Sequence, residues 1–245
     1  DGNANPSWSA SDIATSADGA RSVFVADMDN DGDMDILSAS EEDNTIAWYE
    51  NDGASDPSWS AENIVTDADG ANSVFAADMD NDGDMDIVSA SSSDDTIAWY
   101  ENDGNANPSW TAREIDTNAD GAKAVFVADM DNDGDMDIVS VSSRDDTSDD
   151  TTAWYENLGD TDGDGDLDWT PADIATSGND PYGLFVADMD NDGDLDIVVA
   201  FIEDDKIVWY ETTAIPEFSN IMMPIVSVLA IVGFNYRRRK INPDE

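Results

Sequence analysis

An acidic loop of nine residues occurs four times in this chain, and its repetition restricts the folds that the chain can adopt. The loop has the sequence DMDNDGDMD in three copies and DMDNDGDLD in the last. The copies begin at Asp27, Asp78, Asp129 and Asp188, and a shift of 51 residues superimposes the first three. The neighbouring tryptophans and phenylalanines follow the same shift, which is the signature of an array of structural repeats.

Each repeat contains several short segments of β-forming residues. Ser22–Asp27 precedes the acidic loop and alternates apolar with small residues, which predicts a strand. Asp35–Ser40 and Thr45–Glu50 predict two more strands, separated by the turn-forming residues 41–44. Ser7–Thr15 predicts a fourth, weaker strand. Four short strands in each repeat of about 51 residues predict an all-β fold of four-stranded blades, a β-propeller, with a linear solenoid of sheets as the alternative.

The repeats also define the domain organisation. Residues 1–213 form the repeat region, and residues 214–245 form a C-terminal segment of different composition. We place the four units at about 7–58, 59–109, 110–168 and 169–213. Two insertions of four residues, one within residues 144–152 and one between Glu156 and Trp169, belong in loops, because loops accept added length at small entropic cost.

The chain starts in the middle of a repeat. Asp1–Trp8 is identical to Asp103–Trp110, which follows a WYEN segment in the interior copy. We therefore interpret the chain as a fragment that lacks one or more upstream blades. The alternative is a complete four-bladed ring, in which a strand at Trp8 joins the last unit, since that unit ends at Glu211 without a strand of this type.

The acidic loop has the ligand spacing of a calcium site. Oxygen ligands at positions 1, 3 and 5, a glycine at position 6, a main-chain carbonyl at position 7 and a carboxylate at position 9 surround a hard cation. Mg²⁺ fits less well, because it requires a small octahedral shell and keeps its waters. The predicted Ca²⁺ ligands are Asp27, Asp29, Asp31, Asp33 and Asp35; Asp78, Asp80, Asp82, Asp84 and Asp86; Asp129, Asp131, Asp133, Asp135 and Asp137; and Asp188, Asp190, Asp192, Asp194 and Asp196. Among these, the residues at position 7 are expected to contribute main-chain oxygen.

An EF-hand loop begins in the same way, but it requires a bidentate Glu at position 12 and a helix on each side. Position 12 is occupied by Ser38, Ser89, Ser140 and Val199, and the flanking segments are β-like, so we predict a site between strands. Solvated acidic turns without an ion are the remaining alternative. Against it, five aspartates within nine residues repel one another strongly in the absence of a cation.

A fifth copy of the motif lies outside the repeat register, in the second insertion. Its acidic residues are Asp160, Asp162, Asp164, Asp166 and Asp168. We interpret it as an additional calcium loop that stiffens a longer connection, and the alternative is an acidic surface excursion.

Composition excludes several classes of function. The chain has 9 Lys and Arg against 58 Asp and Glu, and its formal net charge of −49 repels nucleic acids and anionic lipids. It has no His and no Cys, which removes the usual zinc ligands and most nucleophilic catalysis. Carboxylates remain, but identical repeats offer no singular pair of acids, so we expect the protein not to be an enzyme.

The segment VFVADMDNDGDMDIVS, followed by TIAWYEN, resembles the FG-GAP and VCBS-like repeats of integrin α-subunit propellers and of microbial surface proteins. The resemblance covers residues 7 to 211. It implies a β-propeller with Ca²⁺ in the loop between the first two strands of each blade. It also implies an extracellular module for adhesion or for interaction with a protein or a glycan, the particular partner being unknown.

Two further functions remain open at this stage. The first is carbohydrate binding through the Trp-Tyr pairs that begin at Trp48, Trp99, Trp154 and Trp209, and the second is a polysaccharide lyase or hydrolase. Alternation along a strand sends the two rings of each pair to opposite faces. We expect at least one ring of each pair to pack between blades rather than to meet a ligand.

The C-terminal segment contains the apolar run Ile221–Phe234, followed by the basic cluster Arg237–Lys240. As a helix these 14 residues extend about 21 Å, less than the roughly 30 Å of a bilayer core, so a hydrophobic helix here is a marginal span. With Pro216–Phe218, the segment resembles the PEF-CTERM sorting signal of archaea. This resemblance implies cleavage by an archaeosortase-like enzyme and attachment to a lipid.

A retained membrane anchor is the alternative to processing. In either case we expect the protein at the cell surface, with the basic cluster on the cytoplasmic side before any processing.

Overall fold

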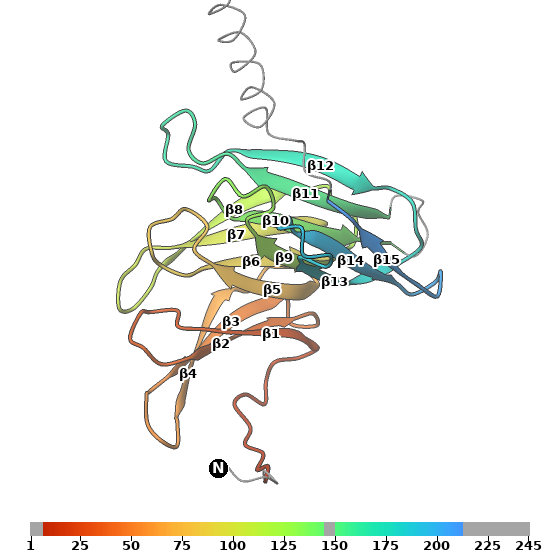
Figure 1. Ribbon diagram of the computed structural model, residues 1–245. Coiled ribbons are helices and arrows are strands. Elements are labelled where there is room, and N and C mark those ends of the chain that lie inside the picture. The colour runs from red at the N-terminus through yellow and green to blue at the C-terminus, as the bar shows by residue number, and fades with distance from the viewer. Residues whose placement is uncertain (1–6, 145–149, 213–245) are drawn as a thin grey trace, which may run out of the picture. The chain divides into compact units, whose positions relative to one another are not determined.

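The structure is a computed structural model that describes residues 7–144 and 150–212 (Figure 1). The first sheet contains β1 (Ala20–Ala26), β2 (Asp35–Ser40), β3 (Thr45–Asn51) and β4 (Trp59–Val65). The second contains β5 (Ala71–Ala77), β6 (Asp86–Ser91), β7 (Thr96–Asn102) and β8 (Trp110–Asp116). The third contains β9 (Ala122–Ala128), β10 (Asp137–Ser142), β11 (Thr151–Asn157) and β12 (Trp169–Ala175). The fourth contains β13 (Pro181–Ala187), β14 (Asp196–Phe201) and β15 (Lys206–Tyr210).

Each sheet is an antiparallel meander in which strands that follow one another in sequence are hydrogen-bonded neighbours. Three sheets have four strands and the last has three. The described residues contain no helix, so the prediction of an all-β fold with repeated blades is confirmed. The strands expected on either side of the first acidic loop, and the turn at residues 41–44, lie where the sequence placed them.

The prediction of a strand at Ser7–Thr15 was wrong, because the described residues form no strand there. The equivalent segment one repeat later is β4, which pairs with β3 and so completes the sheet of the preceding repeat. Each sheet therefore begins and ends one strand later than the corresponding repeat unit that we placed on the sequence. Trp8 is exposed, and the described residues do not add a fourth strand to β13–β15.

The core lies between successive sheets. In the first interface, Leu37 and Trp48 of one sheet pack against Ala71 and Val74 at the start of the next. Equivalent apolar clusters join the second sheet to the third and the third to the fourth. Small residues in the first strand of a sheet leave room for the large indole of the sheet before it.

The Trp-Tyr pairs mostly serve this packing, as expected. The indoles of Trp48 and Trp99 and the phenol rings of Tyr49, Tyr100 and Tyr155 are buried. A sugar cannot stack on rings that are already covered. Trp209, in the fourth sheet, differs because its indole is exposed.

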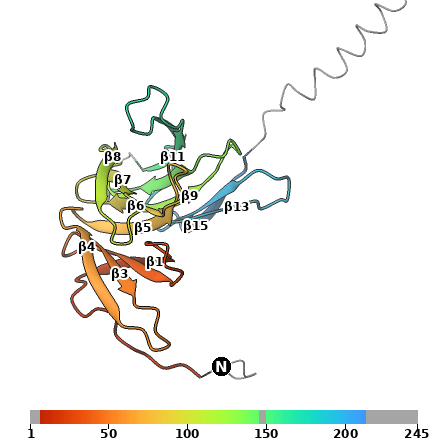
Figure 2. The same ribbon diagram turned by 90° about the vertical axis from the view of Figure 1, so that its left-hand side faces the viewer.

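A row of phenylalanines connects the first strands of the four sheets. The ring centroids of Phe24 and Phe75 lie 4.4 Å apart, those of Phe75 and Phe126 5.0 Å, and those of Phe126 and Phe185 5.2 Å. All three pairs are tilted or edge-on, the arrangements that the quadrupoles of aromatic rings favour. The row therefore contributes to the alignment of β1, β5, β9 and β13, which Figure 2 shows from a second direction.

A buried asparagine at the end of the third strand bonds two sheets together. Asn102 Nδ2 donates to the carbonyl of Met28 in the preceding loop at 2.9 Å and to that of Met85 in its own loop at 3.0 Å. Asn157 repeats both bonds, to Met79 at 3.0 Å and to Met136 at 3.1 Å. Buried carbonyl groups need such partners, because leaving them unpaired costs about 1–3 kcal/mol each.

The two matched asparagines Asn102 and Asn51 allow a test of this bond. Asn51 also accepts from a glycine N–H and donates to its own loop, at Met34, but it is more exposed, and within the described residues its side chain forms no bond to another sheet. We expect Asn102→Ala to lower the free energy of unfolding by about 1–3 kcal/mol more than Asn51→Ala does. Chemical denaturation of both variants measures the difference. Equal losses would contradict a stabilising bond between the sheets.

The sorting signal, membrane anchor and hydrophobic helix predicted for residues 214–245 lie outside the described residues. Within residues 7–144 and 150–212, no helix has the length and apolar character needed to cross a membrane.

Candidate metal centres

Each of the four blade loops connects the first strand of a sheet to the second, for example β1 to β2. The chain reverses within a few residues with the help of two left-handed backbone conformations. The asparagine at position 4 has a positive φ in every copy, 58° at Asn30 and 62° at Asn81, and the glycine at position 6 has φ values from 96° at Gly32 to 103° at Gly193. Asparagine tolerates this region better than most residues and glycine adopts it without strain, which explains both residue types at these positions.

Main-chain N–H groups turn the carboxylates toward the inside of the loop. In the second copy, Gly83 N–H donates to Asp78 Oδ2 at 3.0 Å, and Asp82 N–H donates to Asp80 Oδ1 at 3.2 Å. Asp84 N–H donates to Asp82 Oδ1 at 2.9 Å. Bonds of this kind recur in the other loops, with some variation in the donor. The main chain therefore orients these carboxylate oxygens.

In every loop three carboxylates bring one oxygen each within 4.8 Å of one another. The clustered residues are Asp27, Asp29 and Asp35; Asp78, Asp80 and Asp82; Asp129, Asp131 and Asp133; Asp188, Asp190 and Asp196; and, in the fifth loop, Asp160, Asp162 and Asp164. The predicted positions 1 and 3 are thus together in all five loops. Position 5 joins the cluster in three loops and position 9 in two.

The carboxylate at position 9 is buried and bonded to the main chain of the same sheet. Asp86 Oδ2 accepts from Met79 N–H at 3.1 Å, and Oδ1 accepts from Asn102 N–H at 2.8 Å. Burial raises the pKa of Asp86 to about 7, although these N–H groups act in the opposite direction. For Asp137, in the third loop, burial raises the pKa to about 6. Without a cation, both carboxyl groups are therefore held partly protonated near neutral pH.

The carboxylates at position 3 show the same tendency. Burial, together with the negative charge at position 5, raises the pKa of Asp29, Asp80 and Asp131 above the ordinary value. For Asp190 burial also acts first to raise the pKa; the main-chain N–H of Asp192 lowers it, and the negative charge of Asp192 raises it. A divalent cation would reverse these shifts, because it favours the ionised form of every carboxylate around it.

The second loop contains a carboxylate oxygen that lacks a partner. Asp78 Oδ1 is buried and accepts no hydrogen bond, whereas Asp78 Oδ2 accepts from Gly83. Burial of an unpaired carboxylate oxygen is costly unless a cation or donor compensates it. A donor set made only of carboxylate and carbonyl oxygens suits a hard cation that accepts six to eight oxygens in a flexible geometry, which describes Ca²⁺ better than Mg²⁺ or zinc. The residues present therefore fit the predicted ion.

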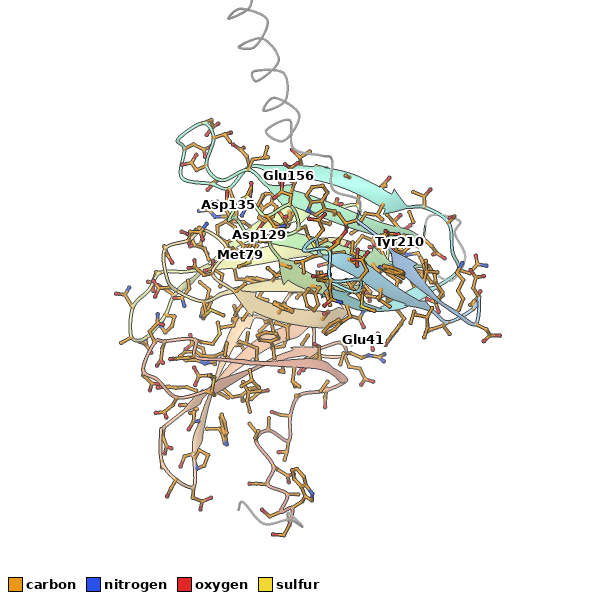
Figure 3. All side chains as sticks on the ribbon, viewed as in Figure 1. Glu41, Met79, Asp129, Asp135, Glu156 and Tyr210 are labelled. Carbon is orange, nitrogen blue, oxygen red and sulfur yellow. The ribbon has the colours of Figure 1, made fainter. Side chains whose placement is uncertain are left out.

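The side chains at position 7 lie outside the clusters. Two of them bond to the asparagine of the preceding loop: Asn30 Nδ2 donates to Asp84 Oδ1 at 2.6 Å, and Asn81 Nδ2 donates to Asp135 Oδ1 at 2.7 Å. Figure 3 shows Asp129 and Asp135 of the third loop beside Met79 of the second. The sequence reasoning did not identify the asparagine at position 4, although its presence in all four copies was a visible signal.

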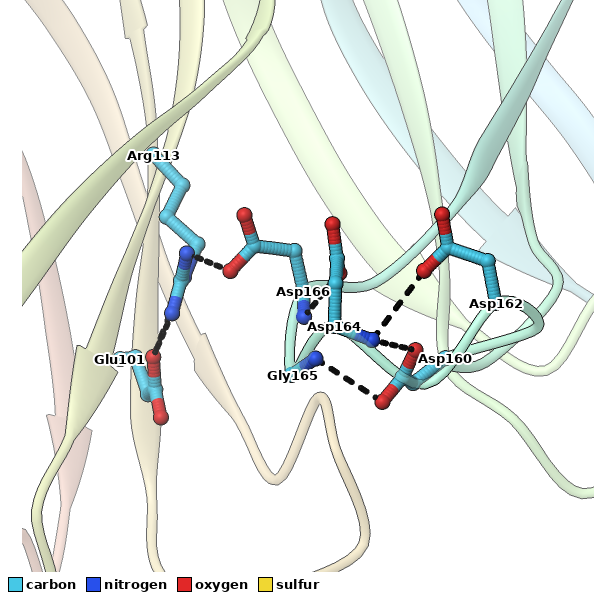
Figure 4. Close-up of polar contacts among 7 residues, drawn as sticks. All are labelled: Glu101, Arg113, Asp160, Asp162, Asp164, Gly165 and Asp166. Carbon is cyan, nitrogen blue, oxygen red and sulfur yellow. Dashed lines mark hydrogen bonds and ion pairs between the residues drawn. The ribbon is translucent and has the colours of Figure 1, made fainter.

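The fifth loop lies between β11 and β12, where the other sheets have a shorter connection. Asp160 accepts from Gly165 N–H at 3.0 Å and Asp164 from Asp166 N–H at 3.0 Å, as in the blade loops (Figure 4). The side chain of Asp166 forms an ion pair with Arg113 of the second sheet. Arg113 also pairs with Glu101 at 2.7 Å and lies 5.6 Å from the ring centre of Trp99. The loop is therefore connected to the neighbouring sheet as well as to its own.

These sheets and loops define a class of all-β repeat proteins whose blades carry acidic, oxygen-rich turns. A family model described as the FG-GAP-like repeat matches the chain twice, over residues 27–89 and 78–140. Each match starts at the first aspartate of one blade loop and ends in the second strand of the next sheet. The resemblance expected from the sequence is thus supported for residues 27–140. No curated protein matches the chain significantly.

The raised pKa values predict the pH dependence of the metal-free protein. Asp86 and Asp137 bind protons in the folded state up to a pKa of about 7 and about 6, whereas an unfolded chain releases them near pH 4. Between these pH values the folded state therefore holds more protons than the unfolded chain, and the stability of the folded state falls as the pH rises. We expect the free energy of unfolding, measured in chelator, to decrease from about pH 5 to about pH 8.

Exposed carboxylates are already ionised above about pH 5, so this interval isolates the buried ones. The same titration in excess Ca²⁺ is the control, and there the decrease should disappear. A metal-free protein that becomes more stable across the interval would show that these groups are not held protonated.

Proposed function

We propose that this protein is an extracellular interaction module whose blades are stabilised by Ca²⁺, one ion in each of the four blade loops and one in the loop at residues 160–168. The observation that carries the proposal is the set of five three-carboxylate clusters, with the unpaired buried oxygen of Asp78 in one of them. The match to FG-GAP-like repeats is consistent with such a module. Ca²⁺ acts here as a structural ion rather than as a signal.

The stabilising effect follows from linkage. An ion that binds the folded loops and not the unfolded chain stabilises the fold by an amount that grows with its concentration, about 2.7 kcal/mol per site at a hundredfold excess over Kd. In the first three blade loops, the buried carboxylate at position 9 connects the loop to the end of the third strand of its sheet. Binding in a loop therefore stabilises the sheet and not the turn alone.

Removal of Ca²⁺ and the substitution Asp78→Asn test this proposal together. In Ca²⁺ we expect Asp78→Asn to lose about 2–3 kcal/mol of stability, the contribution of one ion. In chelator the sign should reverse, because the substitution removes one of several repelling charges. Thermal or chemical denaturation in both conditions, with calorimetric counting of bound Ca²⁺, provides the measurement.

Glu62→Gln is the matched control, since it makes the same charge change at an exposed position on β4. It should alter neither the number of bound ions nor the difference between Ca²⁺ and chelator. A wild-type melting curve that is identical in Ca²⁺ and in excess chelator would refute the calcium proposal.

For the role of the module we propose adhesion, or binding of an extracellular protein or glycan, with no catalytic activity. The described recesses beside Tyr49, Tyr100 and Tyr155 share equivalent tyrosines, threonines and alanines. An enzyme needs a constellation of groups that differs from its repeats. We further propose that residues 214–245 attach the protein to the cell surface, as a membrane anchor or as a signal processed by an archaeosortase-like enzyme.

Carbohydrate binding is the second candidate, because the indole of Trp209 is exposed and offers a stacking surface. We expect protein and glycan arrays probed with the full chain to show ligands that are bound in Ca²⁺ and released in chelator. Incubation of the protein with polysaccharides should generate no new polysaccharide chain ends, because no glycosidic bond is cleaved. Loss of glycan binding on Trp209→Ala would select the carbohydrate function, and polysaccharide cleavage would refute the absence of catalysis.

A further inference from the structure

A side-chain hydrogen bond joins neighbouring blade loops. The asparagine at position 4 of one loop donates to the aspartate at position 7 of the next, from Asn30 to Asp84 at 2.6 Å and from Asn81 to Asp135 at 2.7 Å. The acceptors are carboxylates, which form stronger bonds than neutral oxygens do when they are ionised. The first three loops are therefore linked in series.

The donor Asn81 lies between two predicted ligands of its own loop. Asp80 and Asp82 flank it in the sequence, and their carboxylate oxygens belong to the cluster of the second loop. The main chain of Asn81 has a left-handed conformation, with a φ of 62°. An ion held by Asp80 and Asp82 would therefore also restrict the main chain from which the Asn81 amide extends.

The acceptor Asp135 is at position 7 of the third loop, where its main-chain oxygen is a predicted ligand. Its N–H donates at 2.9 Å to Oδ1 of Asp133, which is a member of the third cluster. Its carboxylate lies outside that cluster and accepts from Asn81. Asn81 thus positions a residue of the third loop without being a ligand there.

A buried contact keeps the second and the third loop at a fixed spacing. Asn157 Nδ2 donates to the carbonyl of Met79, at position 2 of the second loop, and to that of Met136, at position 8 of the third. Asn157 is only 1% exposed. Because this contact already holds the two loops together, the more exposed bond from Asn81 forms at little additional cost in conformational entropy.

The third and the fifth loop show what position 4 does without this bond. Asn132 of the third loop has a φ of 61°, the same conformation as Asn81, but within the described residues its amide forms no bond to the fourth loop. The fifth loop has Gly163 at position 4, with a φ of 81°. A glycine at this position is therefore compatible with the conformation of such a loop.

We propose that the asparagine at position 4 couples Ca²⁺ binding in the first three loops, so that an ion in one loop raises the affinity of its neighbour. The inference rests on the proposed calcium function. An ion in the second loop orders Asn81 and through it Asp135, so binding in the third loop costs less conformational entropy. The coupling is reciprocal, hence an ion in the third loop raises the affinity of the second by the same factor.

Charge alone predicts coupling of the opposite sign. An empty loop is more negative than an occupied one, so an ion in the second loop would weaken binding in the third through charge. Salt suppresses this effect, because the Debye length falls to about 3 Å in 1 M salt. Titration at high salt therefore isolates the coupling that depends on the hydrogen bond.

Ca²⁺ titration of the full chain at high salt, followed by NMR of isotopically labelled glycines, measures each loop separately. The glycines at position 6 report occupancy, since Gly83 and Gly134 donate to the carboxylates at position 1. We expect Asp78→Asn, which removes a ligand from the second loop, to weaken binding in the third loop about fivefold. This is the low end of the usual range of coupling, because the bond is exposed. In a chain that already carries Asn81→Gly, Asp78→Asn should cause no further loss.

Asn132→Gly is the matched control, because it makes the same substitution in the same backbone conformation. Asn81→Gly should weaken binding in the next loop, the third, about fivefold. Asn132→Gly should leave binding in the next loop, the fourth, unchanged. Both variants should fold, since the fifth loop has a glycine at this position.

The possible results separate this inference from the calcium proposal. If the chain binds five ions and Asp78→Asn leaves the third loop unchanged, the coupling is overturned and the calcium proposal stands. The role of Asn81 is overturned if Asp78→Asn weakens the third loop equally with and without Asn81→Gly. Equal losses in the loops that follow Asn81→Gly and Asn132→Gly would overturn it too, because the glycine and not the lost bond would then be the cause. A chain that binds no Ca²⁺ would refute both proposals.

Discussion

The buried carboxylate at the ninth position of the first three blade loops is the contact on which the rest of each blade depends. Asp35 accepts from the N–H of Met28 within the loop and from the N–H of Asn51 at the end of the third strand. One side chain therefore connects the turn, the start of β2 and the end of β3. The same carboxylate is also a predicted metal ligand. The stability of the sheet and the occupancy of the loop are consequently not independent properties.

Packing between sheets depends on a second regularity, the alternation of small and large residues along the array. The tryptophan in the third strand of one sheet fills the space that the alanines and a valine in the first strand of the next sheet leave open. Hydrogen bonds cross the same interfaces, from Asn102 to Met28 and from Asn30 to Asp84. Apolar and polar contacts therefore recur with the same period, so the loops lie in a row along one edge.

The sequence predicted the local elements well, because period-2 alternation and turn residues are local signals. The strands around each loop, the turn at residues 41–44 and the grouping of aspartates at positions 1 and 3 agree with the structure. The assignment of Ser7–Thr15 was wrong for a non-local reason: a strand's propensity does not say which sheet it joins. The link from Asn30 to Asp84 was missed similarly, since it depends on the spatial offset between two sheets.

The offset between repeat and sheet has a consequence for how such genes can change. A sheet takes its fourth strand from the segment that opens the next sequence unit, as β4 does at Trp59. A period added at any point of the array would therefore supply the fourth strand of one sheet together with the first three strands of the next.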